Sequence, residues 1–567
     1  MAELILGIHG GANSTAAIAV DGELAWCVQE ERLTGIKGYM GFPHRAIAAC
    51  LAAVGADPAD LGAVAYGSVS GPVEHCPRDE WLRRLRGFHR RPMLAKAEAQ
   101  LVSAVPAGMD RRVRELLHEA GIRNANVTFH DHHTTHGAAA YYGLRATPDQ
   151  PYLVVTCDGF GDGACATATI WHHGHRVEIA RTDMRNSLGL LWFWLTYASG
   201  FTPHEDEFKL MGMAPYADPG RAAHAAGILR RHLRLDETGL RFQRANPKSS
   251  IERSWPRIHA ELQGLRFDDL FAGLQMFTDE LLTTWIANAI AATGIHDVLA
   301  GGGVFMNIKS NQRIAALDTV HSFAAFPSCS DESLALGALY LQLADQHGHQ
   351  HVAPLASCYL GDDITDDAAL AAVTGTGLHI TRPSDVHQAV AQLLARGVIV
   401  ARCAGRMEYG ARALGNRSIL ADPADADIPR RLNRTIKHRD FWMPFAPAIL
   451  ASAADQYLYN PKTLTSPYMM LGFETIPGAE RDMIAALHPA DLTSRPQIID
   501  DNDTSGLAAI LTRYQHLTGR PVLLNTSLNL HGHPIARTAT DAVHVLQHSD
   551  LTHLQLGNLL VSKSMPA

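Results

Sequence analysis

Histidines are concentrated in the segment 129–136, Phe-His-Asp-His-His-Thr-Thr-His, which runs into an alanine-rich stretch. These residues predict a helix that begins near His132. On such a helix His132 and His136 are four residues apart, so their imidazoles share one face. Two imidazoles in this arrangement can bind a transition metal if a carboxylate joins them. The other interpretation is a polar first turn capped by Asp131, and the spacing alone does not separate the two.

One carboxylate that could complete a metal site is Asp331, within the segment 327–333, Pro-Ser-Cys-Ser-Asp-Glu-Ser. A helix is predicted over 334–343, so Asp331 would lie near its first turn. The helix dipole alone stabilises an acidic residue there, and on spacing alone this structural interpretation is favoured over a metal ligand.

Three glycine-containing turns, at 10–15, 158–163 and 301–303, each follow an apolar stretch that predicts a strand. The succession of strand, glycine turn and strand occurs at 4–20 and again at 152–171, which predicts a duplicated α/β architecture with a phosphate-handling turn in each half. Glycine lets the backbone approach a ligand closely, and three such turns favour nucleotide binding more than one would. The candidate nucleotide-binding residues of this group are Asp158, Gly302, Gly303 and Asn307.

The second half of the chain carries basic residues among apolar ones. Lys437 and Arg439, for example, adjoin Phe441, Trp442 and Phe445. Basic groups embedded in apolar surroundings are unfavourable unless an anion compensates them, so the pattern predicts a phosphate or pyrophosphate site. For any single member, an ordinary surface salt bridge is the alternative. The predicted set comprises Arg406, Arg412, Arg417, Lys437, Arg439 and Arg495, and the strand end at 523–529 adds Asn525, Ser527 and Asn529.

Two further groups of histidines, at 172–175 and 347–351, fall at a predicted hairpin tip and in a polar linker. We assign them no function. The linker predicts a domain boundary between about 345 and 360, which gives domains at 1–350 and 360–567.

Composition narrows the class of protein. The 567 residues carry 49 Lys and Arg against 57 Asp and Glu, a formal net charge of −8, which disfavours a nucleic-acid-binding protein. We see neither a signal-peptide pattern nor an apolar run that could span a membrane. The eight cysteines contain no Cys-x-x-Cys pair, which is typical of reduced thiols, and we expect a cytoplasmic protein.

The order of these motifs resembles the O-carbamoyltransferases of nodulation and antibiotic biosynthesis. After the His-His-x-x-His segment come Lys-Leu-Met-Gly-Met-Ala-Pro-Tyr at 209–216, the glycine turn at 301–303, Asp331, Arg-Ala-Leu-Gly-Asn-Arg-Ser at 412–418 and Leu-Leu-Asn-Thr-Ser-Leu-Asn at 523–529. The resemblance spans nearly the whole chain. It implies an N-terminal domain similar to the tRNA threonylcarbamoyl transferase, of the duplicated actin/Hsp70/sugar-kinase (ASKHA) type, and a C-terminal YrdC-like α/β domain.

The resemblance also implies a reaction in two steps. Carbamoyl phosphate and ATP, with Mg²⁺, give carbamoyl adenylate and pyrophosphate in the YrdC-like half, where Lys437, Arg439, Ser527 and Asn529 match the family's Lys-x-Arg and Ser-x-Asn elements. The carbamoyl group then passes to the hydroxyl of a small secondary metabolite at the N-terminal half. There the residues that match the metal ligands, with iron as the expected metal, are His132, His136 and Asp331. No nucleic acid or membrane is expected as a partner, and a homodimer stays an open alternative.

The sequence departs from the family pattern in the first glycine turn. Family members carry a histidine there, in the pattern His-[Asp/Asn]-x-Ser, as a base for the acceptor hydroxyl, whereas this chain has Ala12 and Asn13. His9 and Asp158 are the alternatives, although the match of Asp158 favours ligand positioning. We expect no single histidine of the first turn to be essential, and His9→Gln to keep more than about a tenth of the transfer activity. A glycine usual before Lys209 is replaced by Phe208.

Two other functions remain in competition. A fused tRNA-threonylcarbamoylating enzyme is disfavoured by the net negative charge. A catalytically silent nucleotide-binding protein is suggested by Ala12, but the basic residues of the second half argue against it. The sequence does not identify the acceptor.

Overall fold

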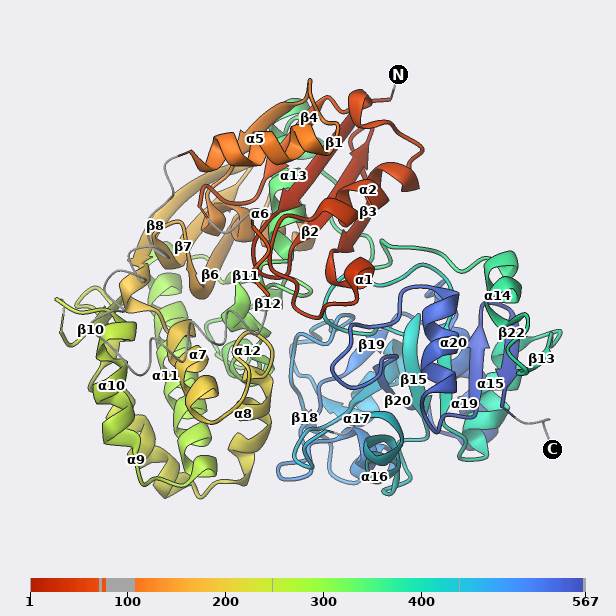
Figure 1. The fold of residues 1–567 in the computed structure, drawn as a ribbon. Coiled ribbons are helices and arrows are strands. Elements are labelled where there is room, and N and C mark those ends of the chain that lie inside the picture. Colours follow the sequence, from red (N-terminus) through yellow and green to blue (C-terminus); the bar gives the residue numbers. More distant parts are fainter. Residues whose placement is uncertain (1, 71–73, 78–107, 247, 438, 564–567) are drawn as a thin grey trace. The chain divides into compact units, whose positions relative to one another are not determined.

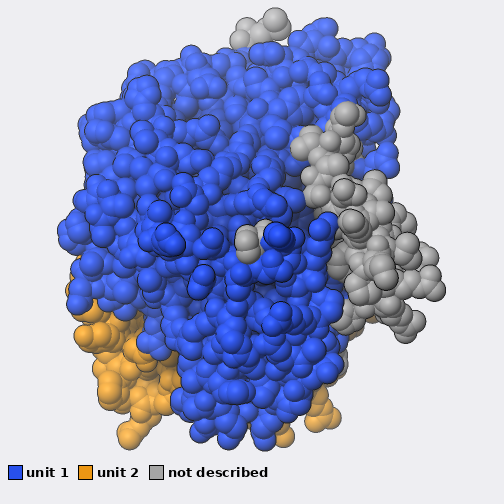
Figure 2. All heavy atoms as spheres, turned by 90° about the vertical axis from the view of Figure 1, so that its left-hand side faces the viewer, with its two compact units in different colours: residues 1–34, 38–356 blue, residues 35–37, 357–567 orange. Residues whose placement is uncertain are grey.

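The computed structural model describes residues 2–70, 74–77, 108–246, 248–437 and 439–563, so His438 of the basic segment lies outside the described residues. The chain divides into two compact units (Figure 2). Unit 1 comprises residues 1–34 and 38–356, and unit 2 comprises residues 35–37 and 357–567.

The first sheet of unit 1 has the strand order β3-β2-β1-β4-β5. Its strands are β1 (Leu4–His9), β2 (Thr15–Val20), β3 (Glu23–Gln29), β4 (Ala63–Tyr66) and β5 (Asn126–Phe129). Strands β1, β2 and β3 pair antiparallel, whereas β1, β4 and β5 run parallel. Because side chains alternate along a strand, Leu4, Leu6 and Ile8 join the core under α2 (His44–Ala53) and α5 (Met109–Glu119), and the residues between them face the other way.

The second sheet repeats this topology. Its order is β12-β11-β6-β7-β8, so β6 takes the place of β1, and β11 and β12 take the places of β4 and β5. The strands are β6 (Tyr152–Gly161), β7 (Ala164–His172), β8 (His175–Asp183), β11 (Asp297–Gly301) and β12 (Ser322–Ala325). Again the first three pair antiparallel and the remaining pairs are parallel. The duplicated α/β architecture predicted from the sequence is confirmed.

Two helices pack against each other between the sheets (Figure 1): α6 (His132–Leu144) contacts β6 and β11, and α13 (Ser333–His347) contacts β1, β2 and β4. Their close approach depends on Gly337, because a Cβ there would lie 2.0 Å from the Thr135 carbonyl oxygen. Similarly, a Cβ at Gly7 would lie 2.2 Å from the Ala335 carbonyl oxygen. The small residues therefore bring the first turn of α6 beside the segment that precedes α13.

The described part of unit 1 contains further helices and one short pair of strands. They are α1 (Glu31–Thr34), α7 (Gly189–Ala198), α8 (Glu207–Met213), α9 (Pro219–Arg230), α10 (Ile251–Leu262), α11 (Phe267–Thr293) and α12 (Ile308–Ala315), with the short pair β9 (Leu233–Leu235) and β10 (Phe242–Arg244). Within the described ranges, no helix is long and apolar enough to cross a membrane. All eight cysteines are present as reduced thiols.

Unit 2 is built on an eight-stranded sheet of order β13-β22-β21-β14-β15-β20-β16-β19. Its strands are β13 (His379–Thr381), β14 (Val400–Cys403), β15 (Arg417–Ala421), β16 (Ala446–Leu450), β19 (Gln497–Ile499), β20 (Val522–Ser527), β21 (His553–Leu556) and β22 (Leu559–Ser562). Alternate residues of the strands pack into two cores. Val400 and Leu523 pack with α15 (Val386–Ala395) and α19 (Leu507–Thr518), whereas Ala401 and Leu524 pack with α14 (Asp366–Val373) and α20 (Ala539–Gln547).

Helices therefore cover both faces of this sheet, as expected for an α/β unit. The helices are α14 (Asp366–Val373), α15 (Val386–Ala395), α16 (Ile428–Leu432), α17 (Ala454–Tyr457), α18 (Glu480–Met483), α19 (Leu507–Thr518) and α20 (Ala539–Gln547), and a small second pair is formed by β17 (Leu458–Tyr459) and β18 (Glu474–Thr475).

Candidate metal centre and anion site

The histidine segment forms the first turn of α6, as its spacing predicts. Asp131 caps the helix by accepting the Thr134 N–H at 2.9 Å, so the capping interpretation holds together with the shared face of the imidazoles. His132 and His136 are 4% and 0% exposed, and their Nε2 atoms are 3.1 Å apart. Two buried imidazoles at this distance are not a solvated polar turn.

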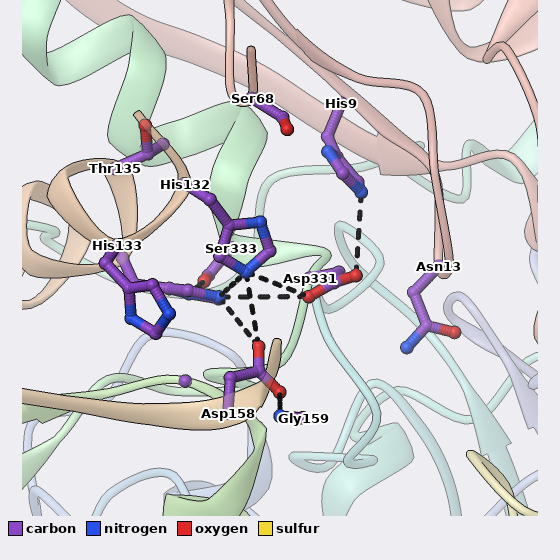
Figure 3. A network of polar contacts seen from close by, with 12 residues as sticks. His9, Asn13, Ser68, His132, His133, Thr135, Asp158, Gly159, Asp331 and Ser333 are labelled. Atoms are coloured by element: carbon purple, nitrogen blue, oxygen red, sulfur yellow. Dashed lines mark hydrogen bonds and ion pairs between the residues drawn. The ribbon is translucent and has the colours of Figure 1, made fainter. Parts of the chain in front are cut away.

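Two carboxylates face this histidine pair (Figure 3). Asp331 precedes α13, and its Oδ1 lies 3.7 Å from His132 Nε2 and 3.8 Å from His136 Nε2. Asp158 comes from β6, and its Oδ2 lies 3.4 Å and 3.1 Å from the same two nitrogens. One donor atom from each of the four residues lies within 4.8 Å of all the others, and we call these four the metal group.

Neighbouring groups orient the metal group. His136 Nδ1 is 2.9 Å from Ser333 Oγ at the start of α13, which leaves Nε2 directed at the carboxylates. The Gly159 N–H donates to Asp158 Oδ1 at 2.6 Å, which leaves Oδ2 for the histidines. Metal-binding histidines and carboxylates in proteins are characteristically held by such outer hydrogen bonds.

The charges of the metal group are strongly coupled. Burial opposes the charged imidazole of His136, but the carboxylates of Asp158 and Asp331 outweigh burial and raise its pKa to about 9. Burial likewise opposes the charge of Asp158, yet His132 and His136 hold its pKa well below the usual range. The charged form of Asp158 is thus stabilised by positive charge beside it, which a divalent cation would supply in place of a proton.

The neighbouring His133 does not belong to this group. Its Nδ1 lies 2.8 Å from the Thr156 hydroxyl, and burial lowers its pKa to about 3. Consecutive histidines of one segment therefore have different surroundings.

The glycines of the third turn have a packing function here. Gly302 has φ +93°, and a Cβ on it would lie 2.4 Å from the Cys157 carbonyl oxygen. A Cβ on Gly303 would lie 3.0 Å from Asp158 Oδ1. Asn307 caps α12 by accepting the Ser310 N–H at 3.1 Å. Gly302 and Gly303 thus let the turn after β11 lie against the strand that carries Asp158.

In unit 2 the structure joins Lys437 to the end of β20. Lys437 is 2% exposed, and its ammonium donates to Asn529 Oδ1 at 2.8 Å, to Ser527 Oγ at 3.2 Å and to the Ser527 carbonyl oxygen. Burial and the nearby Arg439 hold the pKa of Lys437 well below its ordinary value. The residues that match the Lys-x-Arg and Ser-x-Asn elements therefore lie together.

Three arginines form a cationic cluster with Lys437. Burial and Arg412 lower the pKa of Arg439 to about 10, and burial, Arg412 and Arg439 hold the pKa of Arg495 well below its ordinary value. The guanidinium of Arg439 lies 5.5 Å from the centre of the Phe445 ring. Among the described residues, no carboxylate forms an ion pair with Lys437, Arg439 or Arg495. Lys437, Arg439 and Arg495, like charges with no carboxylate ion pair among the described residues, therefore make a site for a polyanion.

Two family models match the chain, and each covers most of one unit. The family model described as carbamoyltransferase N-terminus matches residues 4–340, and the model described as carbamoyltransferase C-terminus matches residues 391–563. This chain belongs to the carbamoyltransferase family.

Relatives of this carbamoyltransferase include nodulation protein NolNO of Sinorhizobium fredii, 29% identical over 98% of this chain and 79% of the relative. An uncharacterised protein of Methanocaldococcus jannaschii is 27% identical over 99% of this chain and all of its own length. Among solved structures, HypF of T. kodakarensis is 10% identical with a TM-score of 0.35, covering 62% of this chain and 49% of that chain. Scores this low say nothing about activity.

Some predicted anion ligands of this carbamoyltransferase have other contacts. Arg417 is 0% exposed and donates to the carbonyl oxygens of Asp362, Ala404, Gly405, Asn416 and Arg537. Arg406 donates to the carbonyls of Leu360 and Gly361, and the Asn525 amide donates to the Ala413 carbonyl and to Gln497. These hydrogen bonds connect loops of unit 2. They give Arg406, Arg417 and Asn525 a structural function, whereas the sequence predicts that these residues bind phosphate.

Two residues of these sites do not follow from the sequence as the structure places them. The sequence predicts that Asp158 binds a nucleotide, because nothing in a strand-and-glycine pattern shows that it faces α6. Glu408 has no predicted function, yet it accepts the N–H groups of Leu414, Asn416 and Arg417 and so shapes the loop that carries Arg412. The one feature of the sequence that could have indicated Glu408 is its position, an acidic residue four places before Arg412.

Proposed function

We propose that this carbamoyltransferase is an ATP-dependent O-carbamoyltransferase that modifies a hydroxyl of a small secondary metabolite. The observation that carries the proposal is that the buried Lys437 and the half-buried Arg439 and Arg495 form no ion pair with a carboxylate among the described residues. A cluster of this kind supports binding of carbamoyl phosphate or of the phosphates of ATP. The family membership supports transfer of the carbamoyl group.

Activation takes place in unit 2 in this scheme. Water first cleaves carbamoyl phosphate to carbamate and inorganic phosphate. A carbamate oxygen then attacks the α-phosphorus of ATP, and the bond to pyrophosphate breaks, which gives carbamoyl adenylate and pyrophosphate. Lys437, Arg439 and Arg495, supported by Arg412, bind the leaving phosphate groups and stabilise the negative charge that develops on them. Ser527 and Asn529 orient the Lys437 ammonium through the contacts described above.

Transfer takes place at the metal group in unit 1. His132, His136, Asp158 and Asp331 would hold a divalent metal, and two imidazoles with two carboxylates suit Fe²⁺, the metal that the family resemblance implies. Bound there, the metal supplies Lewis acidity, which polarises a carbonyl and lowers the pKa of an attached hydroxyl. The Ser333 hydroxyl and the Gly159 N–H fix the orientation of His136 and Asp158 for this purpose.

The proposal is tested by incubating the full-length protein with carbamoyl phosphate, ATP, Mg²⁺, Fe²⁺ and a panel of hydroxylated metabolites. We expect one product with the mass gain of a carbamoyl group, formed only when both carbamoyl phosphate and ATP are present. Lys437→Met serves as the inactive control.

Product formation without ATP would overturn the adenylate scheme. Carbamoylation of tRNA, with none of the small metabolites modified, would favour the tRNA-modifying alternative.

A further inference from the structure

A third imidazole, that of His9 at the end of β1, lies at the edge of the metal group. The alternation that sends Leu4, Leu6 and Ile8 to the core under α2 and α5 sends Gly7 and His9 to the face covered by α13. His9 is 4% exposed, and its Nε2 lies 3.7 Å from Asp331 Oδ2 (Figure 3). It therefore approaches Asp331 on the oxygen that does not face His132 and His136.

The turn after β1 is shaped around this imidazole. A Cβ on Gly11 would lie 2.6 Å from His9 Nε2, so any side chain at position 11 would collide with the ring. A Cβ on Gly10 would lie 2.7 Å from the Tyr66 hydroxyl, which accounts for the first glycine of the pair. The two glycines thus leave space that the His9 ring and Tyr66 occupy.

Neither ring nitrogen of His9 has a hydrogen-bond partner within the described part of the chain. Buried polar groups in native proteins nearly always have such partners, and an unsatisfied one is destabilising. Packing alone does not explain a buried imidazole without hydrogen bonds beside a carboxylate, because an apolar side chain of similar size would fill the space without leaving polar atoms unsatisfied.

The duplication gives His9 a counterpart in the second half. His9 is the last paired residue of β1, and Asp158 directly follows Cys157, the last regularly paired residue of β6. Because β1 and β6 occupy the same place in their sheets, the two residues stand at equivalent strand ends. Asp158 belongs to the metal group, whereas His9 is not one of its four members and reaches it only through Asp331.

We propose that His9 is a positioning residue of the metal centre, whose Nε2–H is directed at Oδ2 of Asp331 and fixes Oδ1 toward His132 and His136. The proposal rests on the metal site of the proposed function. A carboxylate ligand has two oxygens, and a donor on one of them restricts the rotation of the group, which favours metal binding by the other. Removal of such outer partners typically weakens metal binding about 10–100-fold.

The test compares two isosteric replacements in the full-length protein. The amide of His9→Gln reaches the place of Nε2 and can still donate to Asp331, whereas the shorter amide of His9→Asn cannot. His133→Gln, a substitution of a buried histidine outside the metal group, is the matched control. Metal-free proteins are titrated with Co²⁺, and both the dissociation constant and the visible absorption of bound Co²⁺ are measured, with circular dichroism to show that each variant is folded.

We expect His9→Asn to bind Co²⁺ about 10–100-fold more weakly than wild type with an altered visible spectrum, and His9→Gln to stay close to wild type in both. Wild-type affinity and spectrum in His9→Asn would overturn the proposal, as would equal losses in both His9 variants. If the wild-type protein binds no Co²⁺, the metal site of the proposed function fails and the positioning function of His9 fails with it.

Discussion

At the residue scale, the metal group combines imidazoles and carboxylates that come from three separate segments of the chain. Helix α6 contributes His132 and His136, β6 contributes Asp158, and the segment before α13 contributes Asp331. The mutual shifts of pKa, upward for His136 and downward for Asp158, show that each side of the group depends on the other. A metal ion bound to four such donors loses affinity steeply when any one is removed.

We therefore predict that alanine at any one of the four positions of the metal group removes the bound metal. The expected metal content, measured by elemental analysis after Fe²⁺ loading, is well below that of wild type for His132→Ala, His136→Ala, Asp158→Ala and Asp331→Ala. His133→Gln should keep the wild-type content. Full metal content in His136→Ala would exclude that residue from the ligand set, and full content in Asp158→Ala would return Asp158 to a function in nucleotide binding.

The anion site should depend on pH through Lys437. The pKa of this ammonium lies well below its ordinary value in the free protein because of burial and Arg439, and a bound oxyanion favours the protonated form. Affinity for an anion is therefore highest below the lowered pKa and falls as pH rises through it, by up to about tenfold per pH unit. Arg439, with its pKa lowered to about 10, adds to the loss at the alkaline end.

The measurement is the dissociation constant of sulfate, which does not itself titrate in this range, from about pH 5 to about pH 10. In Lys437→Met the affinity should be lower and the dependence on pH much weaker below the pKa of Arg439. A sulfate affinity that is constant over the range in wild type would show that Lys437 does not contact the anion.

At the element scale, loops decide which arginines lie near the other cations of unit 2 and which hydrogen-bond to the backbone. Arg412 and Arg417 belong to one seven-residue motif, yet Arg417, at the start of β15, donates to five carbonyl oxygens, whereas Arg412 lies near Arg439 and Arg495. The sequence predicts that basic residues gather here, but it does not show which of them hydrogen-bond to the backbone and which lie near other cations. That difference follows from the conformation of the loop whose N–H groups Glu408 accepts.

The different surroundings of Arg417 and Arg495 predict that their replacement by methionine has different effects on the stability of the protein. Arg417→Met should lower the free energy of unfolding of unit 2 by about 3 kcal/mol or more, because several buried carbonyl oxygens lose their donor and each costs about 1–3 kcal/mol. Arg495→Met should leave the melting temperature of the ligand-free protein unchanged or raise it, because it relieves repulsion from Arg412 and Arg439.

Thermal and urea unfolding with and without pyrophosphate measure both effects. Arg430→Met is the control, since this side chain is 81% exposed and its ion pair with Asp427 is screened by solvent and adds little to stability. A stable Arg417→Met that loses pyrophosphate binding would contradict the structural function of Arg417 and support the function predicted from the sequence.

Much of the fold follows from local pattern. The helix at α6, the strands around each glycine turn and the repeat of that succession are predicted because alternation and helical spacing are local properties. The pairing of α6 with α13, by contrast, depends on Gly337 lying against the Thr135 carbonyl, a contact between positions about two hundred residues apart. For this reason His132 and His136 could be found together, whereas the inclusion of Asp158 and the approach of His9 to Asp331 could not.

At the scale of the whole molecule, the chain contains two chemically different centres in two compact units. Unit 1 holds the histidines and carboxylates of the metal group, and unit 2 holds the cationic cluster. Activation and transfer of a carbamoyl group have different requirements, since the first needs cations for leaving phosphates and the second needs a Lewis acid at a carbonyl. The central claim is that each unit carries one of these steps.

The most direct test is carbamoyl-phosphate-dependent exchange of labelled pyrophosphate into ATP, measured beside carbamoyl transfer in the same variants. Exchange reports formation of carbamoyl adenylate alone. We predict that His136→Ala retains exchange at a rate close to wild type while transfer is lost, and that Lys437→Met and Arg439→Ala lose both. Loss of exchange in a folded His136→Ala, or wild-type exchange in Arg439→Ala, would contradict the assignment of the two steps to the two units.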